Sequence, residues 1–219
     1  SSRNDVVIQR YLPDGSLDRQ QAHNGLSASY VDIPSALALD SAGNAYVISD
    51  SYFTYDYRMQ KIAPDGTEDT ANWDFYVTDI ANCWVAHAVA TADGHIVIAG
   101  SGLNLVSGSS GSDLFVRTYR QDTGDLVASR SFFLDNDTQS DKLNEFLVNP
   151  DGSLLLFGNT SADGTSTERN WFITKTAADG SVYLNWQMDI DGNGGYDSIL
   201  TGTRGLDGNI LVGGYGAYL

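Results

Sequence analysis

The chain has 219 residues, 42% of them apolar, enough for one sizeable hydrophobic core in one or two domains. Its formal net charge of −16 argues against a nucleic-acid partner, which requires a clustered basic footprint. No apolar run approaches the ~20 residues of a membrane-spanning helix, and a single cysteine excludes an intrachain disulfide.

The acidic residues are nearly all aspartate, with 25 Asp against three Glu. Asp favours turns because its side chain bonds nearby backbone N–H groups, whereas Glu is typical of helix surfaces. No window sustains helical apolar spacing, so the chain is expected to consist of strands and turns. The sequence has neither an initiator Met nor a basic-then-apolar start, so we expect Ser1 to be a processed or excised N-terminus.

Eight glycine-centred turns divide the chain at regular intervals. One series is Gly15, Gly66, Gly124 and Gly180, and the other is Gly43, Gly94, Gly152 and Gly208. From each glycine of the first series to the next glycine of the second is 28 residues, whereas the return interval is 23, 30 and 28 residues. A constant unit that alternates with a loop of variable length is typical of a repeat protein.

Short β-branched or aromatic runs flank these turns. In chain order they are Val6–Tyr11, Ala36–Leu39, Ala45–Ile48, Arg58–Ile62, Trp73–Val77, His87–Ala90, Ile96–Ala99, Leu114–Tyr119, Val127–Phe133, Phe146–Val148, Leu154–Phe157, Phe172–Thr176, Tyr183–Met188, Thr201–Arg204 and Ile210–Val212. A glycine-bearing link between two such runs indicates a hairpin. Four antiparallel strands every 51 to 58 residues are typical of the blade of a β-propeller, with strands a to d counted outward from the axis.

We therefore expect a single all-β domain, a β-propeller of four blades with four antiparallel strands each. The blades cover residues 35–80, 84–135, 143–189, and 197–219 together with 5–24. The last blade takes strands a and b from the C-terminal end and strands c and d from the N-terminal end, because the interval from Gly208 through both ends to Gly15 is 26 residues. Two alternatives stay open: the chain is a piece of a longer propeller, or two chains join into a larger ring.

Several motifs resemble bacterial propeller repeats. Those similar to the SBBP-type repeat are Ser112–Arg117 with Thr123-Gly124, then Asp141, Asp151-Gly152-Ser153, and Tyr196-Asp197 leading to Leu206–Gly213. The opening Tyr11–Asp18 resembles the related delta-type repeat. The resemblance covers essentially the whole chain and implies a propeller fold in a secreted or cell-surface bacterial protein. It implies no single activity.

In a propeller, the b–c loops and the d–a links share one face, and loops that tolerate changes in length are frequent sites of binding. These segments are rich in Tyr and Asn, which suit the recognition of a carbohydrate or a peptide. The expected ligand-binding residues are Tyr52, Tyr55, Trp84, Asn104, Tyr215 and Tyr218. The alternative is that tyrosine is simply common on strand and loop surfaces.

The Asp-rich segment from Asp189 to Asp197 is a candidate calcium site, because carboxylates spaced along a glycine-rich loop can converge on this cation. The candidate ligands are Asp189, Asp191, Asn193 and Asp197. Leu200 stands where an EF-hand loop has its bidentate Glu, which argues against an EF-hand. The alternative is that Asp141 and Asp197, which recur at one place in the repeat, accept N–H groups and shape the d–a link.

Cys83, His87 and Glu145 are the candidates for catalysis. His87 and Glu145 open two inner strands in register, where both side chains can face the axial channel. A thiolate beside His, or a Glu–His pair, can do nucleophilic or acid–base chemistry. The alternative, which we favour, is ordinary packing, because a lone Cys in a β-core is usually inert.

The sequence thus predicts a non-enzymatic binding or adhesion module, secreted or on the cell surface, with a carbohydrate or protein ligand on the b–c/d–a face. Ca²⁺ is the one cofactor expected, and no membrane insertion is expected. One alternative is an extracellular hydrolase or lyase that degrades a polymer at the mouth of the channel. Another is a structural assembly unit. An enzyme requires acid–base groups within hydrogen-bond reach of each other.

Overall fold

The computed structural model describes residues 6–23, 32–51, 57–80, 82–107, 111–132, 134, 140–161, 169–177, 180–190 and 197–216. In these ranges the chain is all-β, with three antiparallel sheets of four consecutive strands and a two-stranded hairpin at each end. The expected all-β architecture is therefore confirmed. The same ranges contain no helix of the length and hydropathy needed to span a bilayer.

The strands follow one another in chain order within each sheet. The N-terminal hairpin is β1 (Val6–Tyr11) and β2 (Leu17–His23). The first sheet is β3 (Asp32–Leu39), β4 (Ala45–Ser51), β5 (Tyr57–Ile62) and β6 (Asp74–Val77). The second sheet is β7 (Cys83–Ala90), β8 (His95–Leu103), β9 (Ser112–Arg120) and β10 (Leu126–Phe132). The third sheet is β11 (Asp141–Val148), β12 (Leu154–Ser161), β13 (Arg169–Thr176) and β14 (Val182–Ile190), and the C-terminal hairpin is β15 (Ser198–Arg204) and β16 (Ile210–Tyr215).

All eight predicted turn glycines have a positive φ, between 72° and 87°. L-residues with a Cβ are strained in this left-handed region, so glycine is the residue that these hairpin turns require. An example is the β3–β4 turn, in which the Gly43 N–H donates to the carbonyl of Asp40 at 3.0 Å. The predicted turns are thus confirmed.

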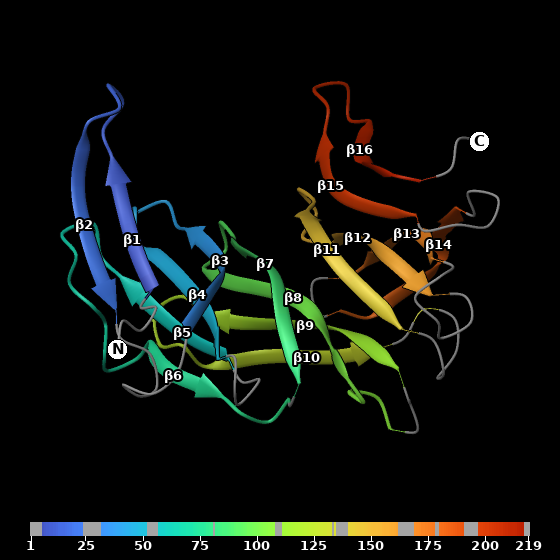
Figure 1. The fold of residues 1–219 in the computed structure, drawn as a ribbon, viewed down its shortest axis with the longest axis horizontal. Helices are drawn as coiled ribbons and strands as arrows, with labels where there is room; N and C mark the ends of the chain where they lie inside the picture. The colour runs from blue at the N-terminus through green and yellow to red at the C-terminus, as the bar shows by residue number, and fades with distance from the viewer. Residues whose placement is uncertain are drawn as a thin grey trace.

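The sheets are arranged as an open arc (Figure 1). The first strands of successive sheets, β3, β7, β11 and β15, lie side by side along it. The two hairpins stand on either side of the opening. The expected fourth blade is therefore absent from the described residues, because β1–β2 and β15–β16 form separate two-stranded sheets. Whether such sheets close into a ring depends on the rotation between each sheet and the one before it. The spacing of the turn glycines in the sequence does not determine this rotation.

Each inner strand carries a β-bulge at the same place. The register shifts by one residue between Pro34 and Ala36 in β3, and at the equivalent positions of β7, β11 and β15. Bulges bend a strand and re-aim its side chains.

The hydrophobic core lies between the sheets rather than within any one of them. The largest cluster joins the first and second sheets and includes Trp73, which is fully buried. A second cluster joins the second and third sheets, and smaller ones hold the C-terminal hairpin and the N-terminal hairpin to the arc. Each sheet is thus stabilised by its neighbours, as in other repeat proteins.

The turn glycines between the third and fourth strands seat each sheet against the previous one. A Cβ added to Gly66 would lie 2.6 Å from Arg19 and Gln21 of β2, and one added to Gly124 would lie 2.2 Å from the carbonyl oxygen of Asn72. At Gly15, in the N-terminal hairpin, such an atom would meet nothing within 4 Å. This close approach to the preceding sheet therefore recurs along the arc. It is missing at the N-terminal hairpin, before which the described residues contain no sheet.

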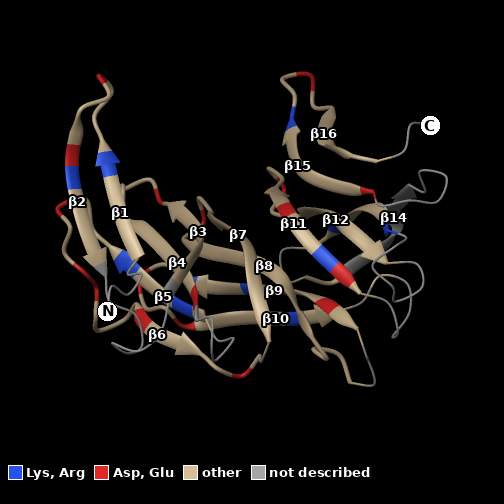
Figure 2. Ribbon diagram, viewed as in Figure 1, with Lys and Arg blue, Asp and Glu red and all other residues tan. Residues whose placement is uncertain are grey.

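Acidic residues cluster at the turns and strand ends of the arc (Figure 2). At Asp14, Asp65, Asp151 and Asp207, the carboxylate accepts the backbone N–H two residues later, at 2.9 to 3.1 Å. The many aspartates are in this respect turn formers, as their abundance over Glu predicted.

Candidate functional site

Two of the three candidate catalytic residues come together where the second and third sheets meet. His87 on β7 and Glu145 on β11 both follow the bulge of their strand. Nδ1 of His87 lies 3.4 Å from Oε1 of Glu145, and the side chains are 37% and 22% exposed. The imidazole packs edge-on against Phe146 at 5.3 Å between ring centroids, and the Phe146 N–H donates to Glu145 at 3.2 Å. The pair is held in place and open to solvent.

Cys83 is not part of this pair. Its side chain is buried in the core between the first and second sheets, and Sγ donates to the carbonyl of Ile80 at 3.3 Å. A buried thiol of this kind serves packing. Of the three catalytic candidates, His87 and Glu145 are thus brought together and Cys83 is placed apart.

Polar links between neighbouring sheets lie at the bulges. Oγ of Ser101, on β8, accepts the N–H of Leu143 on β11 at 2.7 Å. At the next junction Nδ2 of Asn144 donates to the carbonyl of Ile199 at 2.6 Å and to Oδ1 of Asn159 at 3.1 Å. Hydrogen bonds of this kind satisfy backbone groups that the bulges release from the ladders.

Asp50 occupies the equivalent position at the junction of the first and second sheets. Its carboxylate lies 3.3 Å from Oγ of Ser35 and bonds the backbone N–H of Val85. Burial raises the pKa of Asp50 to about 7, against the lowering effect of these two hydrogen bonds. Asp50 is therefore a carboxyl group that changes charge near neutral pH, a property that the sequence did not indicate.

Only part of the expected ligand-binding set lies within the described residues. Tyr52, Tyr55 and Tyr218 lie outside them. Asn104 is exposed at the end of β8 with a φ of 54°. Trp84 is partly buried on β7, and the Trp171 indole N–H donates to the carbonyl of Tyr215 at 3.2 Å. The binding face predicted from these residues stays a prediction.

The calcium proposal likewise falls mostly outside the described residues. Asp191 and Asn193 lie beyond them, and only the backbone of Asp189 is described. Asp197 is buried, and its N–H donates to the carbonyl of Arg169 at 3.0 Å. Among the described residues no three His, Cys, Asp or Glu side chains form a group that could hold a metal.

The alternative for the recurring aspartates is confirmed at Asp141. Its Oδ2 accepts the N–H of Leu134 at 3.0 Å, which closes the link into β11. Asp113 does the same for the preceding loop, where Oδ2 accepts the N–H of Val106 at 2.9 Å. These carboxylates shape loops.

A hollow of about 650 Å³ lies between the second sheet and the turn that joins β11 to β12. Its size is that of a small-molecule or side-chain site. The lining residues are Val89, Ala90, Thr91, Ala92, Asp93, His95, Val97, Thr118, Val127, Ala128, Val148, Asn149, Pro150, Asp151 and Gly152. The floor is thus largely apolar, with carboxylates and one imidazole at the edge.

The two carboxylates at its edge are ionised at neutral pH. Hydrogen bonding from Ser153 lowers the pKa of Asp151 to about 2. Hydrogen bonding from Thr91 lowers the pKa of Asp93, whose Oδ2 also lies 3.2 Å from Nδ1 of His95. The hollow therefore combines an apolar floor with negative charge.

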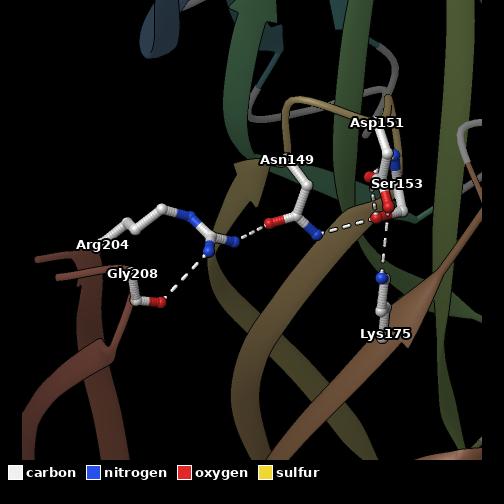
Figure 3. A network of polar contacts seen from close by, with 6 residues as sticks. All are labelled: Asn149, Asp151, Ser153, Lys175, Arg204 and Gly208. Carbon is white, nitrogen blue, oxygen red and sulfur yellow. Dashed lines mark hydrogen bonds and ion pairs between the residues drawn. The ribbon is translucent and has the colours of Figure 1, made fainter. Parts of the chain in front are cut away.

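A polar network holds the turn that separates this hollow from a second one (Figure 3). Asn149 donates to Oγ of Ser153 at 2.8 Å and accepts from the Arg204 guanidinium of β15. Lys175 of β13 lies 3.4 Å from Oδ2 of Asp151. The second hollow, of about 410 Å³, lies between this turn and the C-terminal hairpin. Asn149, Pro150 and Asp151 of this turn line both hollows, so the turn is a wall shared by the two.

Sequence reasoning missed the larger hollow. Its apolar lining residues lie on strands of ordinary composition, and Asp93 and Asp151 were interpreted as turn residues only. The available signal was that both lie in turns at the second series of glycines, one repeat apart, and so must meet at one junction.

No protein-family model matches the chain, and no curated protein matches it.

Proposed function

We propose that this chain is an arc of a β-propeller that acts as a non-enzymatic binding module in a secreted or cell-surface setting. The propeller interpretation is supported by three successive four-stranded antiparallel sheets whose inner strands lie side by side. Such sheets position loops and turns around a rigid scaffold, which is the usual basis of recognition.

The observation that carries the binding function is the hollow of about 650 Å³. An apolar floor with ionised Asp93 and Asp151 at its edge suits a peptide ligand that presents an apolar side chain next to a basic one. The net charge of −16 would attract such a peptide from a distance. This places the proposed ligand on the side of the a–b turns rather than on the loop face predicted from the tyrosines.

Fluorescence polarisation with two labelled peptides tests this proposal. One alternates Lys with Phe, and the other has Glu in place of each Lys. We expect the basic peptide to bind and the acidic one to fail. Val127→Lys should weaken binding at least tenfold, because Val127 lines the hollow and the new ammonium would repel the ligand.

Leu126→Lys is the matched control. Leu126 and Val127 are neighbours on β10 and almost equally exposed, at 47% and 48%, but Leu126 does not line this hollow. Equal loss in both variants, or equal binding of both peptides, would remove the hollow as the site.

The contact between His87 and Glu145 favours a second candidate, a polymer-degrading hydrolase or lyase. An acid–base pair within 3.4 Å, open to solvent at the inner strands, meets the geometric requirement for proton transfer. Release of reducing ends or peptides from extracellular polymers would support it if His87→Gln and Glu145→Gln abolish the release and Cys83→Ala does not. Equal activity in all four proteins would exclude this pair.

A further inference from the structure

The two ends of the arc expose apolar side chains whose equivalents inside the arc are buried. Leu211 on β16 is 61% exposed, whereas Val97 and Leu155, at the same place in β8 and β12, are 3% and 2% exposed. Leu37 on β3 is 53% exposed, whereas Phe146, at the same place in β11, is fully buried. Both ends therefore present surfaces that the fold elsewhere covers.

At two complete junctions, residues at these two positions belong to the same core cluster. Val97 of the second sheet and Phe146 of the third belong to one cluster. Tyr46 of the first sheet and Ala88 of the second, which occupy the same two positions, belong to another. By the same geometry, Leu211 fits against Leu37.

The free edges of the hairpins are complementary as well. In each complete sheet the second strand pairs with the third, as β4 does with β5 and β12 with β13. Within the described residues, the C-terminal hairpin pairs β16 with β15 alone, and the N-terminal hairpin pairs β1 with β2 alone. In the first and third sheets, the residue two positions after one turn glycine pairs with the residue four positions before the next. The same register, counted from Gly208 and Gly15, places Leu211 opposite Arg10 and Gly213 opposite Ile8.

The bulge position fits the same junction. Inside the arc, Asp50 and Ser101 accept the N–H groups of Val85 and Leu143. The equivalent residues at the ends are Tyr215 and Pro34. Because proline has no N–H, their contact would leave no donor unsatisfied.

Each hairpin is anchored to its own end of the arc. The Arg10 and Arg19 guanidinium groups donate to the carbonyl of Pro64 at 3.0 and 3.1 Å, and Val6 packs with Val47 and Ile62 of the first sheet. The C-terminal hairpin is held by Asn144 and Trp171. Since the hairpins stand apart across the opening (Figure 1), one molecule does not satisfy both edges.

We propose that two copies of this chain assemble with twofold symmetry, β16 of each pairing with β1 of the other. The assembly completes two more four-stranded sheets, so that the two arcs together carry eight, within the range of blade numbers that propellers adopt. Each new sheet gains main-chain hydrogen bonds between β16 of one copy and β1 of the other. The junction also buries Leu211 of one copy against Leu37 of the other. The charge of −16 on each copy opposes association, so salt promotes it.

Light scattering after size exclusion measures the first consequence. At 0.5 M NaCl and high protein concentration the mass should be twice the 23.6 kDa of one chain. Leu37→Glu and Leu211→Glu should each return it to that of a single chain, because each buries a charge in the junction. Leu126→Glu is the control, since Leu126 is 47% exposed on the second sheet, away from both ends. A single-chain mass under all conditions, or a doubled mass that survives both end variants, overturns the proposal.

Disulfide trapping then identifies the partner of each edge. Arg10→Cys and Leu211→Cys, mixed as separate proteins and oxidised mildly, should cross-link to each other. Arg10→Cys mixed with Leu206→Cys should not, because Leu206 is fully exposed in the β15–β16 turn, off the paired edge. A chain that carries both Arg10→Cys and Leu211→Cys distinguishes pairing between copies from pairing within one chain. If the mixture fails to cross-link, or if this double variant cross-links only within one chain, the pairing between copies is wrong and the four-bladed closure, or another interface, takes its place.

Discussion

At the scale of the residue, Asp50 is the most consequential side chain that the sequence did not single out. It lies where the first and second sheets meet, and its carboxylate bonds Ser35 and the backbone of Val85. Burial nevertheless raises its pKa to about 7 from 3.8. The folded protein therefore binds this proton more tightly than the unfolded chain, and the ionised form weakens the junction.

The contribution of Asp50 to the free energy of unfolding should accordingly fall as the pH rises from about 4 to 7. A pKa near 7 instead of 3.8 sets an upper limit of about 4 kcal/mol on this loss. Asp50→Asn keeps an acceptor without the charge, so its stability should be nearly independent of pH in this range and exceed that of the unchanged protein at pH 8. Urea unfolding at pH 5 and pH 8 measures the difference.

Asp151→Asn is the opposite control. Hydrogen bonding from Ser153 lowers the pKa of Asp151 to about 2, so its stabilising effect is present above pH 4 and lost as the pH falls toward 2. This variant should be less stable than the unchanged protein at pH 7 and converge with it in acid. If both variants shift stability in the same direction at pH 8, burial is not what governs Asp50.

At the scale of the element, local sequence determines the positions of the turns but not the way in which neighbouring sheets pack at their junctions. The turns were predictable because a positive φ and an Asp-Gly pair act within four residues. The contact between His87 and Glu145 was also predictable, since equivalent positions of neighbouring repeats lie side by side. The hollow and the open arc were not, because they depend on the distance and rotation between whole sheets.

A comparison of Gly94 with Gly124 distinguishes the backbone strain within a turn from the packing of that turn against the neighbouring sheet. Gly94 and Gly124 both have a positive φ, of 86° and 72°, but a Cβ on Gly94 would meet nothing within 4 Å, whereas one on Gly124 would lie 2.2 Å from the Asn72 carbonyl oxygen. Gly94→Ala should therefore cost about 1 kcal/mol, from backbone strain alone. Gly124→Ala should cost about 3 kcal/mol, because the first sheet must also move. Thermal or urea unfolding of both proteins measures this, and equal costs would show that the outer turns do not seat the sheets.

At the scale of the whole molecule, stability should follow the position of each sheet in the arc. The second and third sheets are covered on both sides, and every described side chain of β12 is buried. The hairpins have one neighbour each, and most side chains of β1 and β16 are exposed. In an array stabilised through nearest neighbours, the ends open first.

Hydrogen exchange followed by mass spectrometry tests this gradient and its link to assembly. In dilute, low-salt solution the amides of β8, β9 and β12 should exchange only with global unfolding, and those of β1 and β16 orders of magnitude faster. Raising the protein concentration in 0.5 M NaCl should then slow exchange in β1 and β16, because their edges become paired, while β5 and β13 stay unchanged as strands already paired on both sides. Fast exchange throughout the third sheet would contradict the gradient. If exchange slows in β8 and β9 instead of in the hairpins, the contact between copies lies at the middle of the arc and not at its ends.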